Sequence, residues 1–357
     1  MNLIEKRSII LLVSGTLIIA VLFFRKTESV RLYSSHPAGI MGTDSLLVVI
    51  ASSFEHEKAM TGLHEAENEL RKLEALMSVH LEQSELSRFN SLPANQKMIL
   101  SDKLSSILNE ARKAWFITHG RFDVTCYPLI SLWNKAGKEN RLPDPDKLQE
   151  ARNCSSWEQI HLNGQKAVKF SPTVRLDLGG IAKGLGVDQA IEKLKSMGFQ
   201  GGMVNVGGDL RVYGKPLPGK TAWEVEVRNP FQNEIWAILK FSRKGKSVCT
   251  SGNYYRFIEI NRKRYSHIIN PRTHQNADRV PSVTVIAPTA IEADVWATAL
   301  SISGPKGLVW LKKHPLIHAM LVMGTMDDCR IYHTKGFMEY LFPLPSFPEK
   351  KKWTTIE

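Results

Sequence analysis

The segment 175–190, RLDLGGIAKGLGVDQA, constrains the fold of this chain most strongly. In residues 174–178, before the double glycine, three apolar residues alternate with Arg175 and the acid Asp177, a pattern typical of a buried extended run. The double glycine at 179–180 then turns the chain. Apolar residues follow at spacings that place them on one buried face of a helix: Ile181, Leu185 and Ile191.

The start of this helix has the features of an anion site. Glycine lets a ligand approach the backbone closely, and the first helical turn points unpaired N–H groups at whatever lies beside it. Lys183 lies in that turn, where the helix dipole disfavours a cation. Because an anion opposite Lys183 would offset this cost, the segment indicates a site for phosphate.

The remaining sequence mixes helical and extended patterns. Apolar residues repeat every three or four positions over 55–77 and again after Ser101, a good helix N-cap, whereas 78–100 is typical of a loop. Asn163-Gly164 between two extended runs predicts a β-hairpin. Further strands are expected at 40–52, 201–214, 223–227, 236–241, 257–260, 282–288 and 317–323, with helices at 290–301 and 307–313. This is an α+β fold with largely antiparallel sheets and packed helices.

The net charge of the 357-residue chain is +12, of which residues 1–26 carry +3. Such a balance suits an anionic substrate, a nucleic acid or a membrane surface. No arginine-rich arm is present, so we expect no nucleic-acid partner. The four cysteines have no CxxC spacing, which argues against a cysteine metal site and favours free thiols: Cys126, Cys154, Cys249 and Cys329.

The N-terminus carries targeting information. An apolar run at 9–24 is flanked by basic residues on both sides and lacks a small-x-small cleavage site. We expect an uncleaved signal anchor or transmembrane segment at 1–26, with a cleaved signal peptide as the alternative. A polar linker at 27–39, one domain at 40–345 and a basic, solvated tail at 346–357 would complete the chain.

Four motifs hold residues suited to chemistry, and each also has a purely structural interpretation. Asp294 and Thr298 lie at i and i+4 on one helix face and offer the hard oxygen ligands that magnesium takes. In the structural interpretation, Asp294 is an acid near a helix start and the Thr298 hydroxyl bonds to its own turn. His267 ends a strand before an Asn-Pro turn and is a candidate general base. Gly207-Gly208-Asp209 marks either close ligand approach or a tight turn. RFDVT at 121–125 offers an acid that either grips a ligand or caps a turn.

Taken in order, eight blocks of the sequence resemble the ApbE family of FAD:protein FMN transferases. The blocks span roughly residues 40 to 305: MGTDS at 41, MSVHLEQSELSRFN at 77, GRFDVTCYPLISLW at 120, LDLGGIAKGLGVD at 176, VNVGGDLRVYG at 204, TSGNYYRF at 250, YSHIINPRT at 265 and EADVWATAL at 292. The resemblance implies a two-lobed body outside the cytoplasm that binds FAD and Mg²⁺. It would transfer FMN onto a serine or threonine hydroxyl and release AMP.

The resemblance also assigns residues and partners. The FAD site would be lined by Met41, His80, Arg121, Phe122, Asp123, Asp177, Lys183 and Ile268. The magnesium ligands would be the Gly180 carbonyl, Asp294 and Thr298, with His267 as the base that activates the acceptor hydroxyl. Acceptors would be subunits of membrane redox complexes, either sodium-pumping NADH:quinone reductases or Rnf-type complexes. The expected location is the inner membrane, with the body facing the periplasm.

The chain departs from the family pattern at several positions. His80 stands where a tyrosine usually covers the flavin, Ala297 where some members have a second acid, and His274 where glycine usually follows PRT. The usual lipid-attachment cysteine is also missing. Two other functions therefore stay open, an FAD pyrophosphatase that uses water as the acceptor and a non-enzymatic periplasmic FAD-binding protein.

Overall fold

The computed structural model describes residues 29–216, 219–252 and 257–356. The predicted anchor at 1–26 lies outside these ranges, as do residues 253–256 of the TSGNYYRF block. Within the described ranges no helix is long and apolar enough to cross a bilayer.

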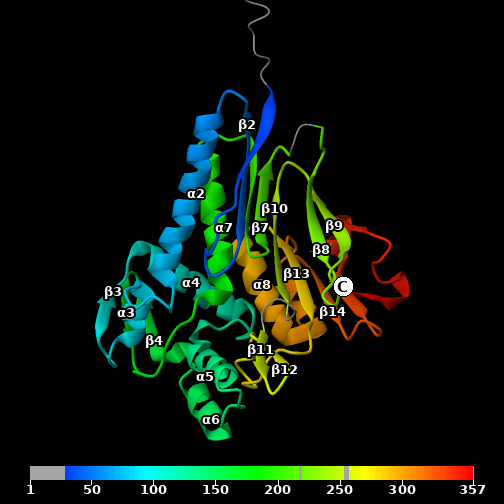
Figure 1. Ribbon diagram of the computed structural model, residues 1–357. Helices are drawn as coiled ribbons and strands as arrows, with labels where there is room; N and C mark the ends of the chain where they lie inside the picture. Colours follow the sequence, from blue (N-terminus) through cyan, green and yellow to red (C-terminus); the bar gives the residue numbers. More distant parts are fainter. Residues whose placement is uncertain (1–28, 217–218, 253–256, 357) are drawn as a thin grey trace, which may run out of the picture.

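A nine-stranded sheet forms the centre of the fold, with the order β1-β2-β6-β7-β10-β13-β14-β15-β17 (Figure 1). Its pairs are antiparallel except β15 with β17, which is parallel. The strands are Val30–Ser35 (β1), Ser45–Ser52 (β2), Gly201–Val206 (β6), Asp209–Gly214 (β7), Lys246–Gly252 (β10), Ser282–Ala287 (β13), His318–Met323 (β14), Arg330–Thr334 (β15) and Trp353–Ile356 (β17).

Three small sheets lie around it. They comprise Lys97–Ile99 (β3), Lys166–Lys169 (β5) and Ile160–Asn163 (β4); Leu341–Pro343 (β16), Ile235–Phe241 (β9) and Trp223–Arg228 (β8); and the hairpin Phe257–Ile260 (β11) with Lys263–Ser266 (β12). The Asn163-Gly164 hairpin is confirmed as β4–β5.

The α-helices are His56–Met77 (α2), Glu85–Ser91 (α3), Asp102–Ile117 (α4), Tyr127–Lys138 (α5), Pro145–Asn153 (α6), Gly179–Ser196 (α7) and Ala290–Ser303 (α8). Short 3-10 helices cover Val124–Cys126 (η1), Trp157–Gln159 (η2), Gly304–Lys313 (η3), Lys335–Glu339 (η4) and Lys350–Lys352 (η5). The Ser101 hydroxyl accepts a hydrogen bond from the Leu104 N–H and caps α4 as predicted.

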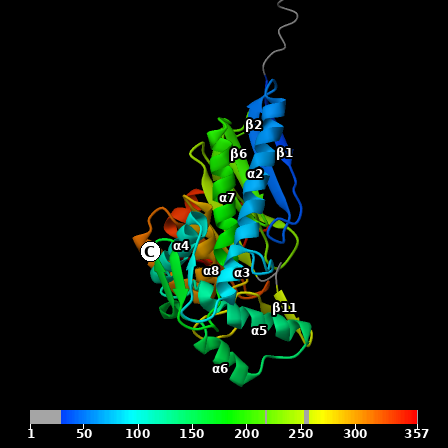
Figure 2. The ribbon, with the colours of Figure 1, turned by 90° about the vertical axis from the view of Figure 1, so that its left-hand side faces the viewer.

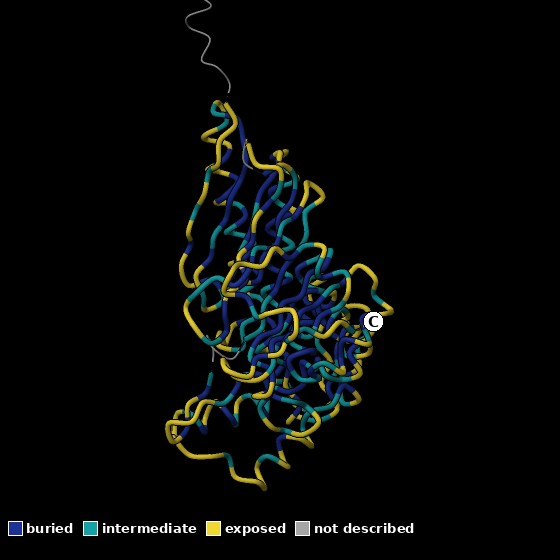
Figure 3. The backbone as a smooth tube through the Cα atoms, turned by 90° about the vertical axis from the view of Figure 1, so that its right-hand side faces the viewer, coloured by how far each residue is buried: buried dark blue, intermediate teal, exposed yellow. Residues whose placement is uncertain are grey.

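The nine-stranded sheet separates two cores. The larger core lies under α2, α7 and α8 on one face, and Figure 2 shows α2 and α7 running side by side along it. The second core lies between the other face and the β8–β9–β16 sheet. A third, smaller cluster joins α5 and α6 to the β11–β12 hairpin. Figure 3 shows buried residues gathered inside the molecule, with exposed residues along its outline.

The structure corrects three expectations. Val30–Ser35, inside the predicted linker, forms β1 because its backbone pairs with β2 along its whole length. Glu85–Ser91, inside the predicted loop, is helix α3, capped by the Ser84 hydroxyl. Trp353–Ile356, inside the predicted solvated tail, pairs with β15 and so belongs to the central sheet.

Candidate functional site

The first turns of α7 and of α8 approach closely at Gly184. A Cβ on Gly184 would lie 2.5 Å from the Ala290 carbonyl oxygen and 2.9 Å from Cβ of Asp294, so only glycine fits at this crossing. The Gly184 N–H donates a 3.1 Å hydrogen bond to Oδ2 of Asp294. The glycine-rich helix start predicted from the sequence therefore meets the predicted metal ligand directly.

Lys183 lies between two buried carboxylates. Its ammonium forms an ion pair with Asp209 and lies 4.0 Å from Oδ1 of Asp294. Burial alone would lower the pKa of Lys183, but the two carboxylates outweigh it and raise that pKa. The cation in the first turn thus already has anionic partners within the protein.

Asp294 is the most strongly perturbed acid of this cluster. Burial raises its pKa to about 7, the Asp209 charge adds to that rise, and Lys183 and the Gly184 N–H oppose it. Such a shift in a buried cluster is typical of functional sites, because a carboxyl poised near neutral pH responds to a bound cation.

Gly180, Phe122 and Thr298 converge beside this cluster. A Cβ on Gly180 would lie 3.2 Å from the Phe122 ring and 3.5 Å from the Thr298 hydroxyl oxygen. Thr298 is only partly buried, whereas its neighbours Ala297 and Ala299 are fully enclosed. A side chain at position 180 would fill the space in front of the threonine hydroxyl.

These residues fit a small, hard cation. The Asp294 carboxylate and Thr298 hydroxyl lie one turn apart on α8, and the Gly180 backbone borders the threonine. In the described ranges, no group of three or more His, Cys, Asp and Glu side chains is arranged to hold a metal. A cation here would therefore depend on carbonyl, hydroxyl and water ligands in addition to one carboxylate.

The RFDVT segment lies beside the turn that precedes α7. The Asp177 N–H donates to the Val124 carbonyl at 2.8 Å, and Oδ1 of Asp177 accepts from the Gly179 N–H at 2.7 Å. Asp123 accepts from the N–H and hydroxyl of Thr125 and from the Trp115 indole. Burial raises the pKa of Asp123 against these hydrogen bonds. The segment thus has the capping role that the sequence left open, at a position next to the α7 turn.

The 267–274 loop is tied to the same region through arginines. Arg121 and Arg272 both donate to the His119 carbonyl, at 3.4 and 2.7 Å, and the Arg121 guanidinium lies over the Trp310 ring at 5.8 Å. Burial, and then the nearby Arg272 charge, lower the pKa of Arg121. His267 is partly buried and Ile268 is buried at the end of β12.

Met41 and His80 occupy different surroundings. A Cβ on Gly186 would lie 3.0 Å from the Met41 methyl carbon, which places Met41 against α7 beyond Lys183. His80 is exposed, and its backbone N–H donates to the Ser78 hydroxyl. The structure therefore groups Met41 with the α7 residues and leaves His80 at the surface.

Sequence reasoning missed several residues that support the site. Gly207-Gly208-Asp209 was interpreted as a site of close ligand approach or a tight turn, with no role for the Asp209 side chain, yet that side chain pairs with Lys183. Asp188 accepts from the Ala290 and Ile291 N–H groups and so caps α8, while it pairs with Arg211. Asp188 and the start of α8 are 102 residues apart in the chain, so no local sequence pattern predicts this cap between two helices.

Two buried residues fix the segment that precedes α7. The Asn90 amide donates to the Leu176 carbonyl and accepts from the Leu176 N–H, each at 2.8 Å. The fully buried Lys169 ammonium donates to the carbonyls of Asn90, Pro172 and Val174. Together they fix the segment that ends at Asp177.

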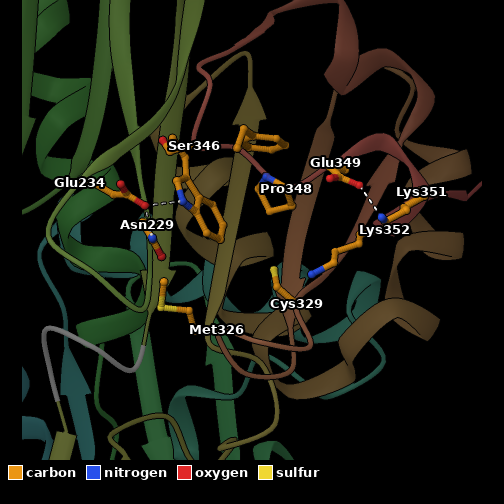
Figure 4. A pocket seen from close by; sticks show the side chains of 11 residues that line it. Asn229, Glu234, Met326, Cys329, Ser346, Pro348, Glu349, Lys351 and Lys352 are labelled. Carbon is orange, nitrogen blue, oxygen red and sulfur yellow. Dashed lines mark hydrogen bonds and ion pairs between the residues drawn. The ribbon is translucent and has the colours of Figure 1, made fainter.

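Two hollows of the described surface lie away from these residues. One, of about 340 Å³, lies between the 229–236 region and the C-terminal segment (Figure 4). Its Glu234 carboxylate accepts from Asn229 and Trp236, and its Lys351 pairs with Glu349. The second, of about 250 Å³, lies near the start of β1. None of the predicted site residues lines either hollow.

Comparison with known proteins agrees with this geometry. A family model described as the ApbE family matches residues 41–321. The FAD:protein FMN transferase of Haemophilus influenzae is 36% identical over 67% of this chain and 72% of its own length. That of Vibrio cholerae is 31% identical over 76% of this chain and 82% of its own length.

Solved structures give the same result. The flavin transferase ApbE from Vibrio cholerae superimposes with a TM-score of 0.75 at 27% identity, over 87% of this chain and 100% of the other. The ApbE protein of Thermotoga maritima gives a TM-score of 0.78 at 26% identity, over 87% of this chain and 99% of the other. The range that matches the family model, 41–321, includes the whole cluster at Gly180, Lys183, Asp209 and Asp294, and the chain belongs to the ApbE family.

Proposed function

We propose that this protein transfers FMN from FAD to a serine or threonine hydroxyl of an acceptor protein, with Mg²⁺ bound and AMP released. The observation that carries the proposal is the convergence of Gly180, Thr298, Asp294 and Lys183, in a family whose named relatives are FAD:protein FMN transferases. Hard oxygen ligands and a lysine beside a helix start suit a pyrophosphate substrate.

Each residue has a separate task in this proposal. Asp294, Thr298 and the Gly180 carbonyl would hold Mg²⁺, which when bound neutralises charge on the phosphate oxygens. Lys183 and Arg121 orient the FAD phosphates. The N–H groups of Gly179, Ile181 and Ala182 at the start of α7 already donate within the protein, contrary to the expectation of unpaired donors there. Asp123, Asp177 and the Phe122 ring shape the wall of the FAD site, to which Met41 and Ile268 add apolar contacts.

The transfer needs one proton acceptor. His267 takes the proton from the acceptor hydroxyl as the hydroxyl oxygen bonds to the FMN phosphorus, and the bond to the bridging oxygen breaks. AMP leaves with that bridging oxygen. The product is a phosphoester that links FMN to the acceptor.

The acceptor and location follow from the same proposal. An apolar, base-flanked segment at 9–24 would hold the body at the periplasmic face of the inner membrane. Subunits of membrane redox complexes of the NADH:quinone reductase or Rnf type are the proposed acceptors, because they occur at that surface.

The test is an acceptor-labelling assay. The full chain is incubated with FAD, Mg²⁺ and an acceptor that carries a Ser/Thr-Gly-Ala-Thr-like segment, and flavin fluorescence is followed on the denatured acceptor. Covalent fluorescence that depends on Mg²⁺ supports the transferase. Free FMN and AMP without labelled acceptor would instead establish the pyrophosphatase, and intact bound FAD would establish a binding protein.

Matched variants connect the activity to the site. Asp294→Asn should abolish labelling while retaining the fold, whereas Asp146→Asn, an exposed helix-start acid on α6, should label like the wild type. His267→Ala should slow transfer without weakening FAD binding. Normal labelling by Asp294→Asn would exclude the α8 site.

A further inference from the structure

The end of the molecule opposite the proposed active site is strongly basic. Register places the start of β1, the end of β2, the start of β6 and the end of β7 together, because Val30 pairs with Ser52, Ile50 with Gly201, and Gly201 with Gly214. The Gly214 N–H also donates to the Arg243 carbonyl. We call this group of segments, 29–31, 53–58, 198–202, 214–216, 219–222 and 242–246, the basic end.

Cations dominate the basic end. Its exposed basic side chains are Arg31, Lys58, Lys215, Lys220, Arg243 and Lys244. Its own acids are Glu55 and Glu57, of which Glu55 pairs with Lys58. The Lys220 Nζ atom lies 3.6 Å from Oε2 of Glu224 on β8. Arg31, Lys215, Arg243 and Lys244 make no ion pair with a carboxylate in the described ranges.

A hollow opens within this cluster. It has a volume of about 250 Å³ and is lined by Lys215, Lys220, Arg243, Gln200, Val30, Ile50, Pro216 and Gly219. No acidic side chain of the described chain lines it. The arrangement suits the phosphate of a lipid headgroup, because three cations and the neutral Gln200 surround the opening.

Apolar side chains accompany the charges. Phe54, in the turn between β2 and α2, is 59% exposed, and Val30 and Leu32 on β1 are also exposed. Exposed apolar side chains beside lysines and arginines are typical of surfaces that lie in the interface of an anionic bilayer.

The course of the chain before β1 also favours a membrane surface as the partner. The apolar segment at 9–24 is followed by Arg25 and Lys26, and β1 already begins at Val30. Five residues, 25–29, can span at most about 17 Å. A segment held in the membrane would therefore keep the basic end close to the headgroups.

We infer that the basic end docks on the surface of a bilayer that contains anionic phospholipid, so that the active site faces away from the membrane. Gly180 lies at the start of α7, whose far end leads into β6 at the basic end (Figure 1). An 18-residue helix is about 27 Å long, so the start of α7 lies about 27 Å from its end near β6. The inference uses the membrane location proposed above but not the proposed chemistry.

The test is lysine footprinting of the full chain in lipid nanodiscs. Acetylation of Lys215, Lys220 and Lys244 is followed by mass spectrometry in neutral phosphatidylcholine discs and in discs with added phosphatidylglycerol. We expect these lysines to react at least about threefold more slowly with phosphatidylglycerol present, and the difference to vanish at high salt. Lys138 and Lys147, on α5 and α6 at the opposite end, are matched controls that should react equally in both discs.

Three outcomes would overturn the inference. Equal reaction of the three lysines in both lipids would exclude docking, as would slowing at Lys138 and Lys147 instead. Soluble glycerol phosphate at matched concentration should give no protection, and protection by it would identify a site for a free phosphate rather than a membrane surface. The acceptor-labelling assay is independent of all these outcomes, so failure of the docking leaves the transferase proposal intact.

Discussion

The backbone N–H of Gly184 on α7 donates to the Asp294 carboxylate on α8, across a separation of 110 residues in the chain. The hydrogen bond is possible because glycine lets the two helices touch. The close crossing of the two helices and the orientation of the Asp294 carboxylate therefore both depend on glycine at position 184.

Gly184→Ala should separate the two helices. Alanine normally stabilises a helix by about 1 kcal/mol relative to glycine, so a loss here must come from the 2.5 Å contact with the Ala290 carbonyl. We expect the free energy of unfolding to fall by about 1–3 kcal/mol and labelling of the acceptor to be lost. Urea unfolding measures the first effect, and an unchanged or raised stability would contradict the crossing.

Asp209→Asn should leave Lys183 with Asp294 as its remaining carboxylate neighbour. Breaking one buried ion pair typically costs about 3–5 kcal/mol, because the other charge stays buried. Lys183→Met should be similarly costly, since it leaves two carboxylates facing each other. The double variant should be no less stable than either single variant. A double variant whose losses simply add would show that the two side chains are not coupled.

The burial of Lys169 should make the stability of the protein depend on pH. Burial, and then the Arg175 charge, lower the pKa of Lys169 from 10.5 to about 8. Between these two values the unfolded chain binds a proton that the folded chain lacks, so the free energy of unfolding rises with pH in this window. Below pH 8 both states carry the charge and the contribution is flat.

Comparison with Lys169→Met isolates this effect. The stability of the wild type relative to the variant should rise by up to about 3 kcal/mol between pH 8 and 10.5. A difference that stays constant over that range would show that the three carbonyls around the ammonium retain its proton.

Local patterns account for the parts of the fold that the sequence predicted well. The periodic helix at 55–77, the Ser101 cap and the Asn163-Gly164 hairpin each depend on neighbours within four residues, and each is confirmed. Short elements were missed because their stability comes from distant partners. Helix α3 is held where Asn90 bonds to Leu176, and β17 exists by pairing with β15.

The site residues likewise divide into those that a local pattern marks and those that only distant contacts bring together. Gly180, Lys183, Asp294 and Thr298 could be selected because family motifs and spacing mark them. Asp209 could not be joined to Lys183, because only the β6–β7 hairpin folded against α7 brings the two together. The Asp188 cap of α8 likewise depends on the angle at which the helices cross.

Thr298→Val should weaken Mg²⁺ dependence selectively. Valine keeps the shape of threonine and removes the hydroxyl that faces Gly180, so the helix packing should persist. We expect the Mg²⁺ concentration for half-maximal labelling to rise at least about tenfold, with FAD binding in the absence of Mg²⁺ unchanged. Thr298→Ser keeps the hydroxyl and is the matched control, which should respond to Mg²⁺ like the wild type. If the valine variant also responds like the wild type, Thr298 is not a ligand and the cation is held by Asp294 and backbone groups alone.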